Sequence, residues 1–145
     1  MVWRDWWRLC RGGNASVGFA AVLITTYASL GFDADVNAIG VILVGLGVSL
    51  FMAGGNVLND LIDLDSDVLN HPDRPLVTGA LTVSNARTAV RLLFIFSLLA
   101  TLVGLQLQAN HIGQSVWLAM VTYVLDLFVQ LSYELGPCYK LRGLQ

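Results

Sequence analysis

The stretch that decides the fold is VNAIGVILVGLGVSLFMAGGNVL at residues 36–58, which runs directly into NDLIDLDSD at residues 59–67. The first part is 23 residues long and carries no charge, and about 20 apolar residues suffice for a helix to cross a bilayer. The second part holds four of the ten acidic residues of the chain. A membrane helix that ends in clustered carboxylates predicts a cation site at the membrane surface.

Three further runs of the chain are similarly apolar. They occupy residues 15–32, 92–109 and 113–135. The 145 residues are 56% hydrophobic with a mean hydropathy of +0.68, well above an average soluble protein. We therefore predict one all-α integral membrane domain with four transmembrane helices. The expected helices span residues 15–32, 36–60, 87–109 and 113–136.

The basic residues of the chain indicate its topology. All eight of them precede the first run, lie between the second and third, or follow the fourth: Arg4, Arg8, Arg11, Arg74, Arg87, Arg91, Lys140 and Arg142. Four crossings place all eight on one side, which the positive-inside rule makes cytoplasmic. We expect a multi-pass protein of the cell membrane with both termini and the acidic cluster in the cytoplasm. Trp3, Trp6 and Trp7 predict a short amphipathic anchor at the interface.

Helical periodicity determines which polar groups of the cluster can act together. At about 100° per residue, one stripe of the helix carries Asn56, Asn59, Asp63 and Asp67. Asp60 lies at the edge of this stripe, and Asp65 points roughly opposite. Like charges on one stripe repel each other, and a hard divalent cation such as Mg²⁺ removes that repulsion. The candidate metal ligands are Asn59, Asp60, Asp63 and Asp67.

Two other readings of the acidic cluster were compared with a metal site. A solvated helix end is a common fate of such residues, although the amides of Asn56 and Asn59 fall at membrane depth, where polar groups are usually functional. A calcium loop of the EF-hand type requires Gly and Glu at its sixth and twelfth positions. Val68 and Arg74 stand there instead, which excludes this reading.

The residues after the cluster are NHPDRPLVTG at 70–79. Pro72 and Pro75 cannot both lie inside a regular helix, so we predict a structured loop at the cytoplasmic surface. Together with the acidic cluster it forms the expected Asp-rich cytoplasmic loop at residues 59–79. Arg74 is expected beside the acids, either as their ion-pair partner or as a donor to phosphate oxygens. His71 is read as an ordinary loop residue.

These segments resemble the UbiA-type superfamily of intramembrane prenyltransferases. NDLIDLDSD followed by NHPDRPLVTG resembles the first Asp-rich motif of that family, N-D-x-x-D-x-x-x-D and then N-x-P-x-R-P-x-x-x-G. RGGN at 11–14 and YKLRGL at 139–144 resemble two further family segments. Residues 11–14 and the Asn56-x-x-Asn59-Asp60 pattern look most like archaeal digeranylgeranylglyceryl phosphate synthases.

The resemblance implies a bundle of about nine transmembrane helices, of which this chain would form the first part. It implies that Mg²⁺ holds the diphosphate of a polyprenyl donor, whose allylic cation is attacked by a lipid or aromatic acceptor. The implied metal and diphosphate ligands are Asn59, Asp60, Asp63 and Asp67. The implied catalytic residues are Asp63, Asp67 and Arg74, and further diphosphate-binding residues are Asn14, Asn56, Asn59 and Lys140.

The chain departs from the family pattern in one respect. A second Asp-rich motif has no counterpart, because the only acids after Asp73 are Asp126 and Glu134. Asp126, inside an apolar run, is either a cavity-lining acid or a residue without a role. Glu134 is expected to pair with Lys140 or Arg142. The chain therefore looks like an N-terminal fragment, a truncated gene product or one half of a split enzyme, and we do not expect these 145 residues alone to catalyse the reaction.

Two functions follow as alternatives. The first is Mg²⁺-dependent transfer of a polyprenyl group, expected to be geranylgeranyl, from its diphosphate to a lipid acceptor such as geranylgeranylglyceryl phosphate. The second is a non-catalytic membrane protein or partner subunit that binds metal or prenyl diphosphate. A phosphotransferase acting on cytidine-diphosphate lipids is set aside, because its Asp-Gly-x-x-Ala-Arg motif is absent. Few and dispersed basic residues argue against a nucleic-acid partner.

Overall fold

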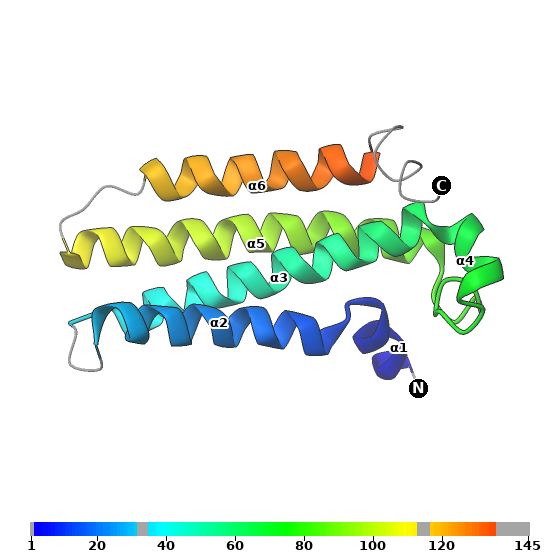
Figure 1. The fold of residues 1–145 in the computed structure, drawn as a ribbon, viewed down its shortest axis with the longest axis horizontal. Coiled ribbons are helices and arrows are strands. Elements are labelled where there is room, and N and C mark those ends of the chain that lie inside the picture. Colours follow the sequence, from blue (N-terminus) through cyan, green and yellow to red (C-terminus); the bar gives the residue numbers. More distant parts are fainter. Residues whose placement is uncertain (1, 32–34, 113–116, 136–145) are drawn as a thin grey trace.

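A computed structural model describes residues 2–31, 35–112 and 117–135. In these residues the chain is all-helical, as predicted. Four long helices run alongside one another (Figure 1): α2 (Gly12–Leu30), α3 (Ala38–Ile62), α5 (Val83–Ile112) and α6 (Trp117–Leu135). The short helices α1 (Val2–Leu9) and α4 (Leu64–Asn70) lie at one end of this bundle, together with the loop at 71–82. Helix α3 is central and packs against both α2 and α5.

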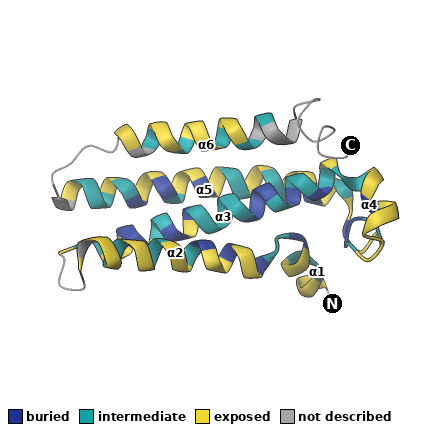
Figure 2. Cartoon of the chain, viewed as in Figure 1, coloured by how far each residue is buried: buried dark blue, intermediate teal, exposed yellow. Residues whose placement is uncertain are grey.

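Two helices of the described chain, α3 and α5, are long and apolar enough to cross a membrane. The 25 residues of α3 span about 38 Å at 1.5 Å per residue, which exceeds the hydrocarbon thickness of a typical bilayer. On α5, large apolar side chains such as Ile95, Phe96 and Leu99 are half exposed, and Figure 2 shows exposed residues along its length. That pattern suits a helix whose outer face contacts lipid. A membrane crossing by α2 and α6, of 19 residues each, stays a prediction.

Helices α3 and α5 approach each other closely because small residues line their contact. A Cβ atom added to Gly104 would lie 2.7 Å from the carbonyl oxygen of Gly40, and one added to Gly40 would lie 2.9 Å from that of Gly104. Ser97, which is fully buried, donates from Oγ to the carbonyl oxygen of Gly47 at 2.7 Å. Small residues and interhelical hydrogen bonds are the features that hold helices together in lipid. This contact fixes the position of α3, which carries the acidic cluster at its end.

Amide and hydroxyl caps set the ends of these two helices. Asn37 caps α3 by accepting a hydrogen bond from the Gly40 N–H at 2.8 Å, and its backbone exchanges two hydrogen bonds with the Gln108 side chain near the end of α5. The hydroxyl of Thr82 accepts from the Asn85 N–H at 3.2 Å, which is the geometry of an N-cap. Helix α5 accordingly begins at Val83, four residues before the expected residue 87.

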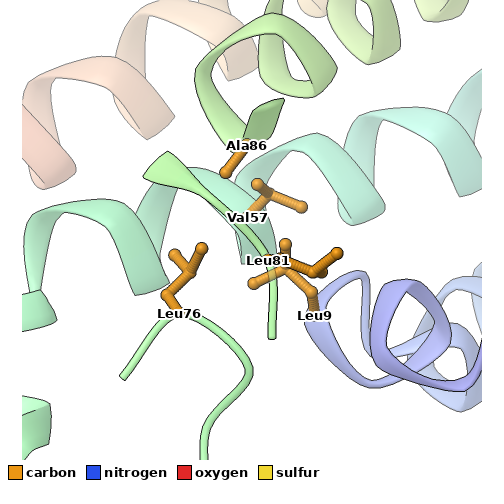
Figure 3. Close-up of a cluster of buried hydrophobic side chains, with 5 residues drawn as sticks. All are labelled: Leu9, Val57, Leu76, Leu81 and Ala86. Carbon is orange, nitrogen blue, oxygen red and sulfur yellow. The ribbon is translucent and has the colours of Figure 1, made fainter. Parts of the chain in front are cut away.

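A small apolar cluster holds the loop at 71–82 against the helices. Its buried members come from α1, α3, the loop and α5: Leu9, Val57, Leu76, Leu81 and Ala86. Figure 3 shows these side chains gathered between the helices and the loop. The short helix α1, which was expected before the first long helix, takes part through Leu9, while Trp3 points outward and is 77% exposed. The cluster therefore places the loop and the start of α2 next to the acidic end of α3.

Candidate functional site

The acidic segment is a helix with one interruption. Helix α3 ends at Ile62, and Asp63 separates it from α4 with backbone angles φ −84° and ψ 5°. The hydrogen-bond ladder still crosses this residue, because the Asp63 N–H donates to the Asn59 carbonyl and the Asp67 N–H donates to the Asp63 carbonyl. Helical spacing is therefore preserved from Asn59 to Asp67. Asp63 itself is half-buried, whereas Asp65 is exposed.

Asp60 and Asp67 form the buried pair of the site. Each is only 4% exposed, although carboxylates are rarely buried unless they are paired. Seven residues at about 100° each make about 700°, which is close to two full turns, so the two carboxylates lie on one side of the segment. The expected stripe had grouped Asn59 and Asp63 with Asp67 and had placed Asp60 at its edge. The structure brings Asp60 and Asp67 together through Arg74, and a metal-binding role of the expected stripe stays a prediction.

Arg74 is the residue that joins these two acids. Its Nη1 atom donates a hydrogen bond to Asp60 Oδ1 at 3.2 Å and a second, shorter one to Asp67 Oδ2. Turns in the loop place the arginine there, since the Arg74 N–H donates to the His71 carbonyl and the Thr78 N–H donates to the Arg74 carbonyl. The loop is structured, as predicted. Of the two roles expected for Arg74, the structure shows the ion pair with the acids, and donation to phosphate oxygens stays a prediction.

Arg11 is a fourth member of the site that the sequence expectation did not include. Its Nη2 atom donates to Asp60 Oδ1 at 3.1 Å, across 49 residues of sequence. The residue lies between α1 and α2 with φ 48° and ψ 56°, a left-handed conformation that is uncommon for a side chain other than Gly or Asn. This conformation lets the chain turn between the two helices and brings Arg11 to the end of α3. The RGGN match at 11–14 was the available signal, but it directed attention to Asn14.

A cavity of about 320 Å³ with both polar and apolar lining residues adjoins these ion pairs. Its lining comes from the start of α2, the second half of α3 and α6: Arg11, Phe51, Met52, Gly55, Asn56, Asn59 and Gln130. Asn56 also donates from Nδ2 to the Cys10 carbonyl at 3.1 Å, which ties α3 to the turn before α2. Gln130 was not predicted, and it lies so close to α3 that a Cβ on Gly55 would be 3.1 Å from its Nε2 atom.

The remaining predicted residues lie apart from this centre. Asn14, His71 and Asp126 are exposed, and no described residue forms a hydrogen bond or ion pair with Asp126 in α6. Lys140 and Arg142 lie outside the described residues, as does the side chain of Glu134. The predicted role of Lys140 and the predicted pairing of Glu134 therefore stay predictions.

Electrostatic contacts also extend to the rim of the site. Arg8 in α1 donates from Nη2 to Asp73 Oδ2 at 2.6 Å and to the Asp73 carbonyl at 3.0 Å, an exposed pair between α1 and the loop. Beside it, burial raises the pKa of the Cys10 thiol above its ordinary value, because removal from water disfavours the thiolate. The turn at residues 8–11 is thus fastened to the loop and to α3 at several points.

The donor set was compared with the requirements of Mg²⁺. This ion takes one or two carboxylates and leaves its other positions to water and phosphate oxygens. Asp60 and Asp67 supply two carboxylates that converge on one point, and Asn56 and Asn59 supply amide oxygens in the adjoining cavity. The residues therefore suit Mg²⁺ in kind, but Arg74 Nη1 holds the position between the carboxylates. Within the described ranges, no three side chains of Asp, Glu, His or Cys gather as a metal cluster.

Comparison with known proteins gives the family. The model of the UbiA prenyltransferase family matches residues 19–133. The chain belongs to this family. Similar curated proteins include the digeranylgeranylglyceryl phosphate synthase of Methanobrevibacter smithii, 35% identical over 66% of this chain and 31% of that protein. The synthase of Methanoculleus marisnigri is 40% identical over 61% of this chain and 30% of that protein.

The fold has a counterpart among solved structures. A structure from work on digeranylgeranylglyceryl phosphate synthase in membranes matches with a TM-score of 0.73 over 92% of this chain and 43% of that one. Its sequence identity is 23%, so this match supports the helical fold alone. The chain spans about a third of the length of the curated relatives it matches. Family membership and the expected resemblance to the archaeal synthases are thereby confirmed.

Proposed function

We propose that this chain supplies the Asp-rich, diphosphate-binding part of a Mg²⁺-dependent membrane prenyltransferase. The proposed reaction transfers a polyprenyl group, geranylgeranyl in the first instance, from its diphosphate to a lipid acceptor such as geranylgeranylglyceryl phosphate. The observation that carries this proposal is the convergence of Asp60, Asp67, Arg74 and Arg11 beside a cavity at one end of the bundle. The family supplies the chemistry, and the names of the similar archaeal proteins supply the substrates.

The geometry suggests how the work is divided between residues. Arg74 and Arg11 are planar donors suited to phosphate oxygens, and Arg11 lines the cavity directly. Asn59, Asp60, Asp63 and Asp67 would hold Mg²⁺, which when bound supplies Lewis-acid stabilisation of the charge that develops on the departing diphosphate. The catalytic assignments of Asp63, Asp67 and Arg74 belong to this proposal.

The apolar wall of the cavity has a separate task. Phe51 and Met52 are its large apolar lining residues, and Phe51 packs edge-on against the rings of Phe94 and Tyr123. Such a wall would accept the first isoprene units of a donor and keep water from an allylic cation.

Asn14 and Lys140 are proposed as further diphosphate-binding residues. The proposed topology has four crossings with both termini in the cytoplasm.

A second function is supported by one observation. The carboxylates of Asp60 and Asp67 are already neutralised by the guanidinium groups of Arg74 and Arg11. A chain of this kind could act as a non-catalytic partner that binds a prenyl diphosphate for another subunit. The two functions differ in whether product forms when a second Asp-rich half is supplied.

The test is a reconstitution in lipid vesicles. The purified chain, alone and co-expressed with the remaining helices of an archaeal synthase, is mixed with geranylgeranyl diphosphate, geranylgeranylglyceryl phosphate and Mg²⁺, and the ether lipid product is measured. We expect product from the combined halves, loss of product with Asp67→Asn, and no loss with Asp65→Asn, which alters an exposed acid of the same segment. Absence of product from the combined halves would refute the enzymatic proposal.

A further inference from the structure

The charged groups at the centre of the site balance one another. Two carboxylates, on Asp60 and Asp67, face two guanidinium groups, on Arg74 and Arg11, so their formal charges cancel. The side chains of the acids are 6% and 5% exposed, whereas those of Arg74 and Arg11 are 22% and 38% exposed. A ligand that arrives from the cavity or from water therefore meets the arginines first. The carboxylates lie behind them.

This arrangement opposes either ligand on its own. A divalent cation that enters alone must sit beside two guanidinium groups, one of which already occupies the position between the carboxylates. A diphosphate that binds alone gains hydrogen bonds from the two arginines. It then lies next to two carboxylates that no longer have a cation to neutralise them. Unpaired buried charges are costly, so each half-occupied arrangement is disfavoured. When both ligands are present, every charge has an opposite neighbour again.

We propose that Arg74 and Arg11 exchange partners on binding, moving from Asp60 and Asp67 to diphosphate oxygens while the released carboxylates take the metal ion. This inference rests on the proposed function and adds a rule to it: metal and diphosphate bind cooperatively, and the arginine pair is the source of the coupling. By linkage, each ligand raises the affinity for the other by the same factor. Arg74 contributes most, because a single nitrogen of its side chain contacts both acids.

The exchange needs only side-chain motion. The loop that carries Arg74 is held by the buried side chains of Leu76 and Leu81, and near the site α3 is held against α5 by Val57 and Ala86 of the same cluster. The backbone on both sides of the ion pairs is therefore anchored. Rotation of the long Arg74 side chain can move its N–H donors from the carboxylate oxygens to the diphosphate oxygens without separating the helices.

The experiment measures coupling directly, with no turnover. Mn²⁺ replaces Mg²⁺ as an ion whose bound fraction is read by electron paramagnetic resonance, and inorganic pyrophosphate replaces the donor. The intact chain in detergent micelles is titrated with Mn²⁺ with and without pyrophosphate, and the protein-free solution gives the chelation background. We expect pyrophosphate to strengthen Mn²⁺ binding by about tenfold or more, within the usual range of coupling between two sites. Arg74→Gln should strengthen binding of Mn²⁺ alone and reduce the coupling to less than about twofold.

Two further variants complete the design. Arg11→Gln removes the second guanidinium and should lower the coupling in the same direction, which keeps the test available if Arg74→Gln does not fold. Arg87→Gln removes an exposed cation at the start of α5 and should match the unaltered chain.

The outcomes separate the inference from the proposed function. Equal Mn²⁺ affinity with and without pyrophosphate, or full coupling retained in both arginine variants, would overturn the exchange and leave a diphosphate site in place. Absence of any Mn²⁺ or pyrophosphate binding under all combinations would overturn both.

Discussion

Removal of the Arg74 side chain tests whether the buried ion pairs hold the site together. Arg74→Ala leaves Asp67, which is 4% exposed, without the cation that neutralises it among the described residues, while Asp60 keeps Arg11. Breaking a buried pair from one side costs about 3–5 kcal/mol. Arg74 is itself 22% exposed and Asp60 stays compensated, so we expect the lower end, a loss of about 3 kcal/mol in the free energy of unfolding.

The matched control is Arg8→Ala, which breaks an exposed ion pair of the same region. Arg8 and Asp73 have side chains that are 42% and 76% exposed, and exposed pairs contribute about 0–1 kcal/mol. Unfolding is followed in mixed micelles by titration with sodium dodecyl sulfate, with tryptophan fluorescence as the signal, since Trp6 packs against the core cluster. The two variants should differ by about 2 kcal/mol or more.

A second substitution distinguishes an uncompensated charge from simple loss of contacts. Asp67→Asn in the Arg74→Ala background removes the unpaired negative charge and should recover at least about 1 kcal/mol. Equal destabilisation by Arg74→Ala and Arg8→Ala, or no recovery in the double variant, would refute the reasoning that the pair is buried and mutually dependent.

Three other predictions concern packing and reactivity. Gly104→Ala places a methyl group 2.7 Å from a backbone oxygen of α3 and should destabilise the fold by about 1–3 kcal/mol. Gly13→Ala, whose methyl group meets nothing within 4 Å, should be tolerated. Thermal unfolding of both variants measures the difference. Tyr123→Phe removes a 3.0 Å hydrogen bond between α6 and α5 and should lower the free energy of unfolding by about 0.6 kcal/mol, the average for such bonds in a membrane. A loss above about 2 kcal/mol would show that Tyr123 contributes more than this one hydrogen bond. Because burial raises the pKa of Cys10, its thiolate fraction at pH 7 is below that of a free cysteine. Maleimide labelling of Cys10 in a Cys138→Ser background should therefore be slow at pH 7 and become faster as the pH rises. Labelling at pH 7 as fast as that of free cysteine would contradict this.

The sequence was informative wherever the signal was local. The uncharged run at 36–58 predicted α3, and Pro72 and Pro75 predicted the loop that follows α4. Arg74 was expected beside the acids, and the structure places it there. The expected stripe of acids was built from spacings of four residues, and it did not anticipate the pair that Arg74 joins. The pair that forms, Asp60 with Asp67, uses a spacing of seven.

The residues that sequence reasoning missed depend on distant parts of the chain. Arg11 reaches Asp60 across 49 residues and requires a left-handed backbone angle between α1 and α2. Gln130 reaches the cavity because α6 comes close to Gly55 of α3. Neither contact has a local pattern that could have indicated it. Helix α5 begins earlier than expected because Thr82 acts as its N-cap. The sequence alone did not single out Thr82, since Ser84 and Asn85 are also residue types that cap helices.

The amino-acid sequence by itself determined that this chain is helical and apolar, that its acids gather after a membrane helix, and that it belongs with the prenyltransferases whose motif it carries. Hydrophobic length and helical period act between neighbours, so they can be read along the chain. Only the tertiary structure decided which carboxylates are buried and which cations neutralise them. Those pairings follow from the loop at 71–82 packing against the end of α3 and from the turn at Arg11. Their strength depends on exclusion of water that no single segment can provide.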